Sequence, residues 1–156
     1  MPTITPATTP ADLAAIGELL RAYAEALPID LGYQGFEGEI ADLPGKYAPP
    51  RGALLIARDA DGRPLGCAAL RPLADPGACE MKRLYLAPEA RGSGLGRALA
   101  EAIVGAARAA GYRELRLDTL PSMTAAIALY EALGFRRIAP YYAPTPEGTV
   151  FLGLAL

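Results

Sequence analysis

The sequence contains no histidine and no tryptophan, and only two of its 156 residues are cysteine. Without histidine, the chain has no imidazole general base, no Ser-His-Asp or Cys-His nucleophile system and no histidine-containing zinc site. Two cysteines are also too few for a tetrahedral zinc site made of cysteine alone. Proton transfer in this protein must therefore use carboxylates, tyrosines, lysines, cysteines or water, and we expect no metal.

Long apolar runs and an excess charge of one sign are also missing. The 15 basic and 17 acidic residues are interspersed and give a formal net charge of −2, so nucleic acid is not expected as a partner. No apolar run approaches the roughly 18 residues that a membrane span needs, and residues 1–10 lack the basic and apolar segments of a signal peptide. Cys67 and Cys79 fit a reducing compartment better than a disulfide framework. We therefore expect a cytoplasmic protein with no membrane partner.

The remaining composition, 52% apolar and 21% charged, is typical of one globular domain spanning residues 1–156. Thr9, Pro10 and Asp12 form a helix start with a capping box. Apolar spacing and turn residues predict helices at 10–27, 36–43, 94–110 and 122–133, and strands at 3–5, 53–58, 64–70, 79–86, 114–119, 135–139 and 149–154. Ser122 is the expected cap of the last helix. This order predicts an α/β domain whose sheet mixes antiparallel and parallel neighbours, with a three-strand antiparallel meander in the middle.

A glycine-rich loop carries the clearest chemical signal. A strand ending at Leu86 runs into a loop containing Gly92, Gly94 and Gly96, and this loop opens a long helix. Such a loop presents backbone N–H groups at the positive end of a helix, without side chains in the way, and can bind phosphate or pyrophosphate. The flanking Arg91 and Arg97 can add charge-assisted contacts. The alternative is a tight strand-to-helix turn that binds nothing.

Two nucleotide-binding motifs fit this loop poorly. A Walker loop requires a Gly-Lys-Ser/Thr ending, which is absent. The Rossmann fingerprint fits better, because Gly92-Ser93-Gly94 follows a strand and Asp118 ends the next one. However, Arg97 stands where its third glycine should be, and the meander leaves no room for a doubly wound sheet.

The loop does resemble a different motif. Arg91-Gly92-Ser93-Gly94-Leu95-Gly96 is similar to the Arg/Gln-x-x-Gly-x-Gly/Ala loop with which N-acetyltransferases of the GNAT superfamily bind the pyrophosphate and pantetheine of acetyl-CoA. Leu84 to Pro88 is similar to the strand ending before that loop, and Ala126 to Phe135 resembles the family's helix that ends in Leu-Gly-Phe. The resemblance implies the GNAT fold, a single mixed and mostly antiparallel sheet with helices on both faces. It also implies direct transfer of an acetyl group from acetyl-CoA to an amine bound at the same time.

The resemblance assigns the cosubstrate contacts residue by residue. Backbone groups along the strand would contact the pantetheine and acetyl group at Leu84, Tyr85 and Leu86. The pyrophosphate would lie among the loop residues Arg91, Gly92, Ser93, Gly94, Leu95, Gly96 and Arg97. A β-bulge in this strand, common in the family, would explain why Lys82-Arg83 interrupts an apolar run.

The resemblance also names the groups that handle protons. Glu80 lies where some members keep a general-base glutamate, and the alternative is a salt bridge with Lys82 or Arg83. Asp118 is the rival base, because other members place an acid on the next strand. Tyr130 matches the tyrosine that protonates the departing CoA thiolate, and the alternative is core packing. Many members have asparagine where this chain has Met123, which can make at most an apolar contact with the cosubstrate.

The acceptor site is less defined by the sequence. The Gly/Pro-rich region from Leu31 to Gly52 predicts a substrate-side wall or lid, with disorder as the alternative. Candidate wall residues are Tyr33, Gln34, Phe36, Glu39, Tyr141 and Tyr142, although tyrosines beside prolines also serve in packing. Aromatic walls with carboxylates suit an amine, whereas Lys82, Arg83 and Arg51 would suit a substrate that also bears a carboxylate, such as an amino acid.

These observations predict an enzyme that moves the acetyl group of acetyl-CoA to a primary amine of a small molecule, with a protein amine as the second choice. The alternative from another class is a GNAT-fold acyl-CoA-binding sensor without turnover. We expect a monomer or a homodimer. The absence of histidine leaves the chemistry to Glu80, with Asp118 in reserve, and to Tyr130.

Overall fold

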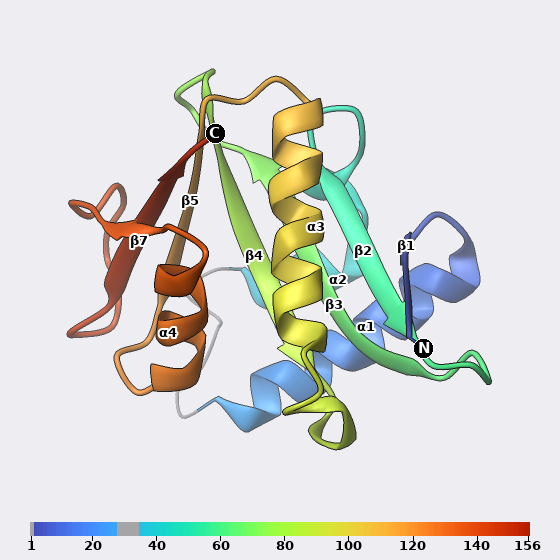
Figure 1. The fold of residues 1–156 in the computed structure, drawn as a ribbon. Helices are drawn as coiled ribbons and strands as arrows, with labels where there is room; N and C mark the ends of the chain where they lie inside the picture. Colours follow the sequence, from blue (N-terminus) through green and yellow to red (C-terminus); the bar gives the residue numbers. More distant parts are fainter. Residues whose placement is uncertain (1, 28–34) are drawn as a thin grey trace.

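A computed structural model of the chain describes residues 2–27 and 35–156 (Figure 1). The α-helices are α1 (Pro10–Ala26), α2 (Phe36–Ala41), α3 (Leu95–Ala109) and α4 (Thr124–Ala132), and two 3-10 turns are η2 (Gly45–Tyr47) and η3 (Pro88–Ala90). The strands are β1 (Thr3–Pro6), β2 (Ala53–Arg58), β3 (Pro64–Pro72), β4 (Ala78–Leu86), β5 (Glu114–Thr119), β6 (Arg136–Arg137) and β7 (Val150–Ala155). The predicted wall residues Tyr33 and Gln34 lie outside the described residues.

The strands form one seven-stranded sheet in the order β1-β2-β3-β4-β5-β7-β6. Among the described strands, β4 and β5 pair in parallel and every other neighbouring pair is antiparallel. The predicted meander of β2, β3 and β4 is confirmed, and β1 extends it by a fourth antiparallel strand. The sheet is therefore mixed and mostly antiparallel, as the sequence predicted.

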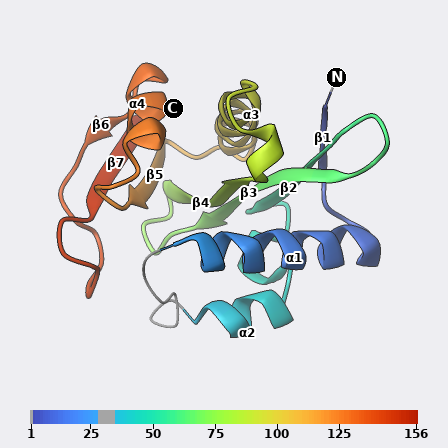
Figure 2. The ribbon, with the colours of Figure 1, turned by 90° about the horizontal axis from the view of Figure 1, so that it is seen from below.

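Helices cover both faces of this sheet (Figure 2). On one face, α3 and α4 enclose a core that includes the fully buried Leu99, Ile103 and Leu115. On the other face, α1 and α2 enclose a second core, in which Ile16 and Leu20 are fully buried. Burying side chains of this kind contributes roughly 1.5–3 kcal/mol each, so the two apolar layers hold the sheet from both sides. Among the described residues, no helix is long and apolar enough to cross a membrane.

Local sequence signals explain where most elements begin. At the start of α1, the backbone N–H of Asp12 donates to Thr9 Oγ1 over 3.1 Å and the Thr9 N–H donates back to the Asp12 carboxylate over 3.4 Å, which confirms the predicted capping box. The prediction for α4 was wrong at its start: Met123 is the N-cap, and Ser122 lies one residue too far upstream to cap the helix. The strand predicted at 135–139 contracts to the two residues of β6.

Candidate active site

The central feature of the site is the point where β4 and β5 separate. The two strands pair only from Ala78 to Glu80, opposite Glu114 to Arg116, whereas β5 stays paired with β7 along its whole length. Beyond Glu80, β4 and β5 therefore diverge into a V, visible in Figure 1. A cavity of about 100 Å³ lies in this V, between strands β4 and β5, and helices α1 and α4 contribute to its walls. Side chains lining this V cavity include Lys82, Leu84, Asp118, Met123 and Tyr130.

A β-bulge shapes the free part of β4. The register with β3 shifts between Cys67, which faces Tyr85, and Ala69, which faces Lys82. Two residues of β4 therefore stand opposite one residue of β3, and Arg83 at this point has a φ of 61°. The predicted bulge is confirmed. A bulge turns side chains away from simple alternation, which explains how two consecutive charged residues fit into a mostly buried strand.

The helix that follows β4 presents an open N-terminus. Its N-cap is Gly94, which adopts a φ of 86°, and no side chain caps the helix. Nothing lies within 4 Å of the position that a Cβ would take at Gly92 or Gly94. The first turn contains no acidic residue, and its first N–H groups have no helical carbonyl to bond. These residues fit an anion such as the pyrophosphate of acetyl-CoA, because an anion can approach the backbone without meeting a side chain.

The other residues predicted to contact the cosubstrate lie in different surroundings. The Arg91 guanidinium donates to the carbonyl of Leu86 over 3.3 Å and lies 5.8 Å from the Tyr85 ring centroid, so it packs against the end of β4. Arg97 lies half-exposed, with its Nε 3.7 Å from the carboxylate of Glu101, one helical turn further along α3. Leu84 and Leu86 pack on the α3 side of the sheet, whereas the Tyr85 ring packs on the α1 side.

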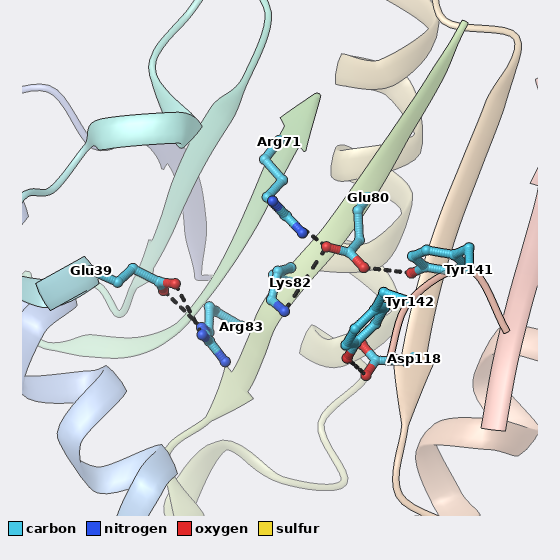
Figure 3. Close-up of polar contacts among 8 residues, drawn as sticks. All are labelled: Glu39, Arg71, Glu80, Lys82, Arg83, Asp118, Tyr141 and Tyr142. Carbon is cyan, nitrogen blue, oxygen red and sulfur yellow. Dashed lines mark hydrogen bonds and ion pairs between the residues drawn. The ribbon is translucent and has the colours of Figure 1, made fainter. Parts of the chain in front are cut away.

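Glu80 lies at the apex of the V and is completely buried. Its Oε1 accepts a hydrogen bond from Arg71 Nε at 2.8 Å and lies 3.9 Å from Lys82 Nζ, and its Oε2 accepts from the Tyr141 hydroxyl (Figure 3). Glu80 does not line the V cavity. Of the two salt bridges considered from the sequence, the one with Lys82 forms, whereas Arg83 pairs with Glu39 instead.

Asp118 differs from Glu80 because it does line the V cavity. One of its oxygens, Oδ2, accepts a hydrogen bond from the Tyr142 hydroxyl (Figure 3). The rings of Tyr141 and Tyr142 both pack against Phe151 of β7, with centroids 5.2 and 5.6 Å away. The tyrosine pair suggested as an acceptor wall is thus bonded to the two carboxylates suggested as bases.

Tyr130 enters the V cavity from α4. Its side chain is 6% exposed, and its hydroxyl makes no hydrogen bond with any other residue that the structure describes. Burial raises the pKa of the Tyr130 phenol above its usual value, and the neighbouring Tyr23 and Asp118 raise it further. A phenol is protonated at neutral pH even at its usual pKa of about 10, so Tyr130 has a proton to give. Met123, at the start of α4, lines the same cavity, where its side chain could make only an apolar contact with a bound cosubstrate.

A second, larger cavity of about 430 Å³ lies on the α2 side of β3 and β4, and we call it the α2 cavity. Arg83 closes part of its wall: it donates to both oxygens of Glu39 over 2.8 and 3.0 Å and lies 4.9 Å from the Phe36 ring centroid. Lys82 lines both cavities. Arg51, suggested as a substrate contact, lines neither of them and lies 5.9 Å from the Tyr112 ring centroid.

Sequence reasoning missed Arg71, although a signal for it existed. Arg71 stands directly opposite Glu80 in the register of the β3–β4 hairpin. Counting outward from the predicted Asp75-Pro76-Gly77 turn would have paired these two residues. The bonds from Tyr141 and Tyr142 had no such signal, since they join segments 61 and 24 residues apart.

Comparisons with known proteins agree with this geometry. Residues 16–135 match the Acetyltransferase (GNAT) family. The chain is 40% identical, over 147 residues, to an uncharacterised N-acetyltransferase of Schizosaccharomyces pombe, covering 94% of this chain and 90% of that protein. A solved structure from Klebsiella pneumoniae, whose name places it among the acyl-CoA N-acyltransferases, is 32% identical, with a TM-score of 0.74 over 100% of this chain and 98% of that one. A phosphinothricin acetyltransferase from Sinorhizobium meliloti, solved in complex with acetyl-CoA, is 25% identical, with a TM-score of 0.75 over 99% of this chain and 88% of that one. The chain belongs to the acetyltransferase (GNAT) family and is an N-acetyltransferase.

Proposed function

We propose that this N-acetyltransferase moves the acetyl group of acetyl-CoA to the primary amine of a small molecule. The observation that carries the proposal is the V cavity between β4 and β5, which holds a carboxylate, Asp118, and a buried phenol, Tyr130, in its walls. The open N-terminus of α3 supplies an anion site beside the same strand. The Sinorhizobium meliloti relative, solved with acetyl-CoA, supports the choice of cosubstrate.

The chain would hold acetyl-CoA through backbone groups. The N–H groups between Gly92 and Arg97 suit the pyrophosphate, with no glycine Cβ in the way. The edge of β4 from Leu84 to Leu86 no longer pairs with β5, so its backbone groups are available to the pantetheine arm on that side. Hydrogen bonds from fixed backbone donors would also orient the acetyl group toward the V cavity.

The chemistry needs one base and one weak acid. Acetyl-CoA supplies an activated thioester, so the transfer forms an amide bond to the amine nitrogen, breaks the C–S bond, and releases the CoA thiol and one proton. The acceptor amine is an ammonium at neutral pH and must first lose a proton. Asp118 lines the V cavity and is the carboxylate in position to take it. Tyr130 then gives its proton to the departing sulfur and regains one from the second N–H of the amine.

Glu80 remains the second candidate for the base. Its complete burial and its bonds to Arg71 and Tyr141 suit it better to positioning the groups around the apex of the V. A proton could reach Glu80 only through another group or a water. We therefore assign the direct proton transfer to Asp118.

The size of the α2 cavity supports a small acceptor. Its volume of about 430 Å³ falls within the roughly 300–1,000 Å³ of small-molecule sites. Lys82, which lines both cavities, marks where they approach each other. An amine held in the α2 cavity would therefore reach toward the V cavity.

The proposal is tested by measuring thiol release from acetyl-CoA with a panel of small primary amines and with peptides bearing free amines. We expect turnover with at least one class of small amine and little turnover with peptides. Turnover with peptides alone would overturn the small-molecule proposal. Tight binding of acetyl-CoA without turnover on any amine would instead favour a sensor.

A further inference from the structure

Lys82 is a largely buried cation that lies between the two cavities. Its side chain lines both the V cavity and the α2 cavity, and it is 10% exposed. Its neighbour Arg83 also lines both, but the carboxylate of Glu39 binds the Arg83 guanidinium through two hydrogen bonds. Figure 3 shows the two cations side by side on β4, with Glu39 reaching only Arg83. The positive charge of Arg83 is thus matched, and that of Lys82 must be matched elsewhere.

Lys82 shares its nearest counter-ion. The Glu80 oxygen that lies 3.9 Å from Lys82 Nζ accepts a shorter hydrogen bond, of 2.8 Å, from Arg71, and the other Glu80 oxygen accepts from Tyr141. One negative charge therefore serves two cations. An ammonium withdrawn from water is stable only when it is well paired, and burial lowers the pKa of Lys82 accordingly. An anionic group of a ligand would complete its surroundings through a charge-assisted hydrogen bond.

Lys82 and Arg83 line both cavities, and the other charged side chains differ between the two sides. The α2 cavity is lined by four cationic and two anionic side chains, namely Lys46, Arg71, Lys82, Arg83, Glu39 and Asp42. On the V side, Asp118 provides a carboxylate that faces the site of transfer. A ligand that places a negative group at Lys82 and a positive group at Asp118 would meet a group of opposite charge at each end. An amine and a carboxylate separated by one carbon have this arrangement.

We propose that the acceptor is an amino acid, with its carboxylate bound to Lys82, its amine directed toward Asp118 and its side chain in the α2 cavity. This inference rests on the proposed function, since it names the class of small amine that the enzyme acetylates. Of the three cations that the sequence suggested for a carboxylate, Arg83 is already paired and Arg51 lies outside both cavities, which leaves Lys82.

The experiment compares amino acids with the amines that lack their carboxylate, such as phenylalanine with phenethylamine and leucine with isoamylamine. The rate of thiol release gives kcat/KM for each member of a pair. A charge-assisted hydrogen bond to the carboxylate should favour the amino acid by about tenfold or more. Lys82→Met should bring the ratio of kcat/KM between the amino acid and its plain amine to about one, whatever the absolute rates, whereas Lys82→Arg should keep the preference. Lys46→Met is the matched control, because it makes the same substitution at an exposed position of the α2 cavity and should keep the preference.

Each outcome decides between the proposals. Equal or faster acetylation of the plain amines by the wild-type enzyme overturns the amino-acid proposal and leaves small-amine acetylation standing. A preference that survives in Lys82→Met, or that disappears in Lys46→Met, overturns the assignment to Lys82. No acetylation in either set overturns the proposed function as well. The wild-type comparison needs no variant, so it decides the substrate class even where Lys82→Met fails to fold.

Discussion

Replacing Gly94 by alanine tests whether the start of α3 binds the cosubstrate. Gly94 has a φ of 86°, and no atom lies within 4 Å of the position where a Cβ would stand. A methyl group there meets no protein atom, but it occupies the space in front of the helix N-terminus. The left-handed conformation costs a residue with a Cβ about 1–2 kcal/mol. In a chain of this size roughly 2–4 °C of Tm correspond to 1 kcal/mol, so we expect Gly94→Ala to lower Tm by about 2–8 °C.

The same methyl group should weaken binding of CoA by a larger margin. A hydrogen bond to a charged group contributes about 1.5–3 kcal/mol, and about 1.4 kcal/mol corresponds to a factor of ten in Kd. If the methyl group breaks one contact between a backbone N–H and the pyrophosphate, Kd for CoA should rise by about 10- to 100-fold. Isothermal titration calorimetry with CoA measures this directly, without an acceptor.

Gly111 provides a matched control at the opposite end of α3. It has the same φ of 86°, and nothing lies within 4 Å of its Cβ position either. Gly111→Ala should therefore lose a similar amount of Tm and keep the wild-type Kd. Wild-type affinity in Gly94→Ala, or an equal loss of affinity in both variants, would refute the assignment of this helix end to the pyrophosphate.

Three further predictions concern the acid, the base and the pH dependence of stability. Tyr130→Phe should lower kcat by about 10- to 100-fold with Kd for CoA unchanged, because general acids typically contribute at least this much. Its control, Tyr112→Phe, removes a hydroxyl that donates to a backbone carbonyl 2.6 Å away and should cost about 1 kcal/mol of stability without changing kcat. Asp118→Asn should lower kcat by about 100-fold or more, whereas Glu80→Gln should mainly lower Tm; the reverse pattern would make Glu80 the base. Burial raises the pKa of Glu39, but the hydrogen bond and the positive charge of Arg83 lower it by more, so the pKa of Glu39 lies below its usual value. The stabilisation by Glu39 is therefore present above the unfolded-state pKa of about 4.3 and is lost as the pH falls through the folded pKa. Glu39→Gln should thus flatten the decline of Tm between about pH 5 and pH 3, and an unchanged decline would contradict this.

The parts of the fold that the sequence predicts are those whose signals lie within a few residues of one another. Thr9 and Asp12 bond to each other across one helical turn, so their spacing alone predicts the start of α1. Gly94 ends a loop and begins a helix within the same six-residue motif. The bulge was implied by the resemblance to the GNAT family, and the charged pair Lys82-Arg83 marks its place in the apolar strand. In each case, the local backbone geometry favours a particular residue type, so the feature can be recognised from neighbouring residues in the sequence.

The contacts that organise the candidate site have a different origin. Glu80 meets Tyr141 because β7 lies beside β5, which brings the segment after β6 back over the apex of the V. That segment follows a strand of two residues and contains prolines at 140, 144 and 146, so no periodicity predicts where its side chains point. The sequence could suggest the tyrosine pair as a wall. Only the order of the strands shows that the two hydroxyls bond to the two carboxylates.

The hydrogen bonds from Tyr141 and Tyr142 give the two neighbouring carboxylates, Glu80 and Asp118, different surroundings in a chain that has no histidine. Glu80 bonds to Arg71 through one oxygen and to Tyr141 through the other, and it lines neither the V cavity nor the α2 cavity. Asp118 bonds to Tyr142 through Oδ2, and its Oδ1 bonds to no other residue in the described part of the chain. One phenol is enough to orient a carboxylate and still leave an oxygen for an incoming ammonium. The partners of the two carboxylates therefore support the proposed division of tasks, in which Glu80 holds the apex of the V and Asp118 accepts the proton.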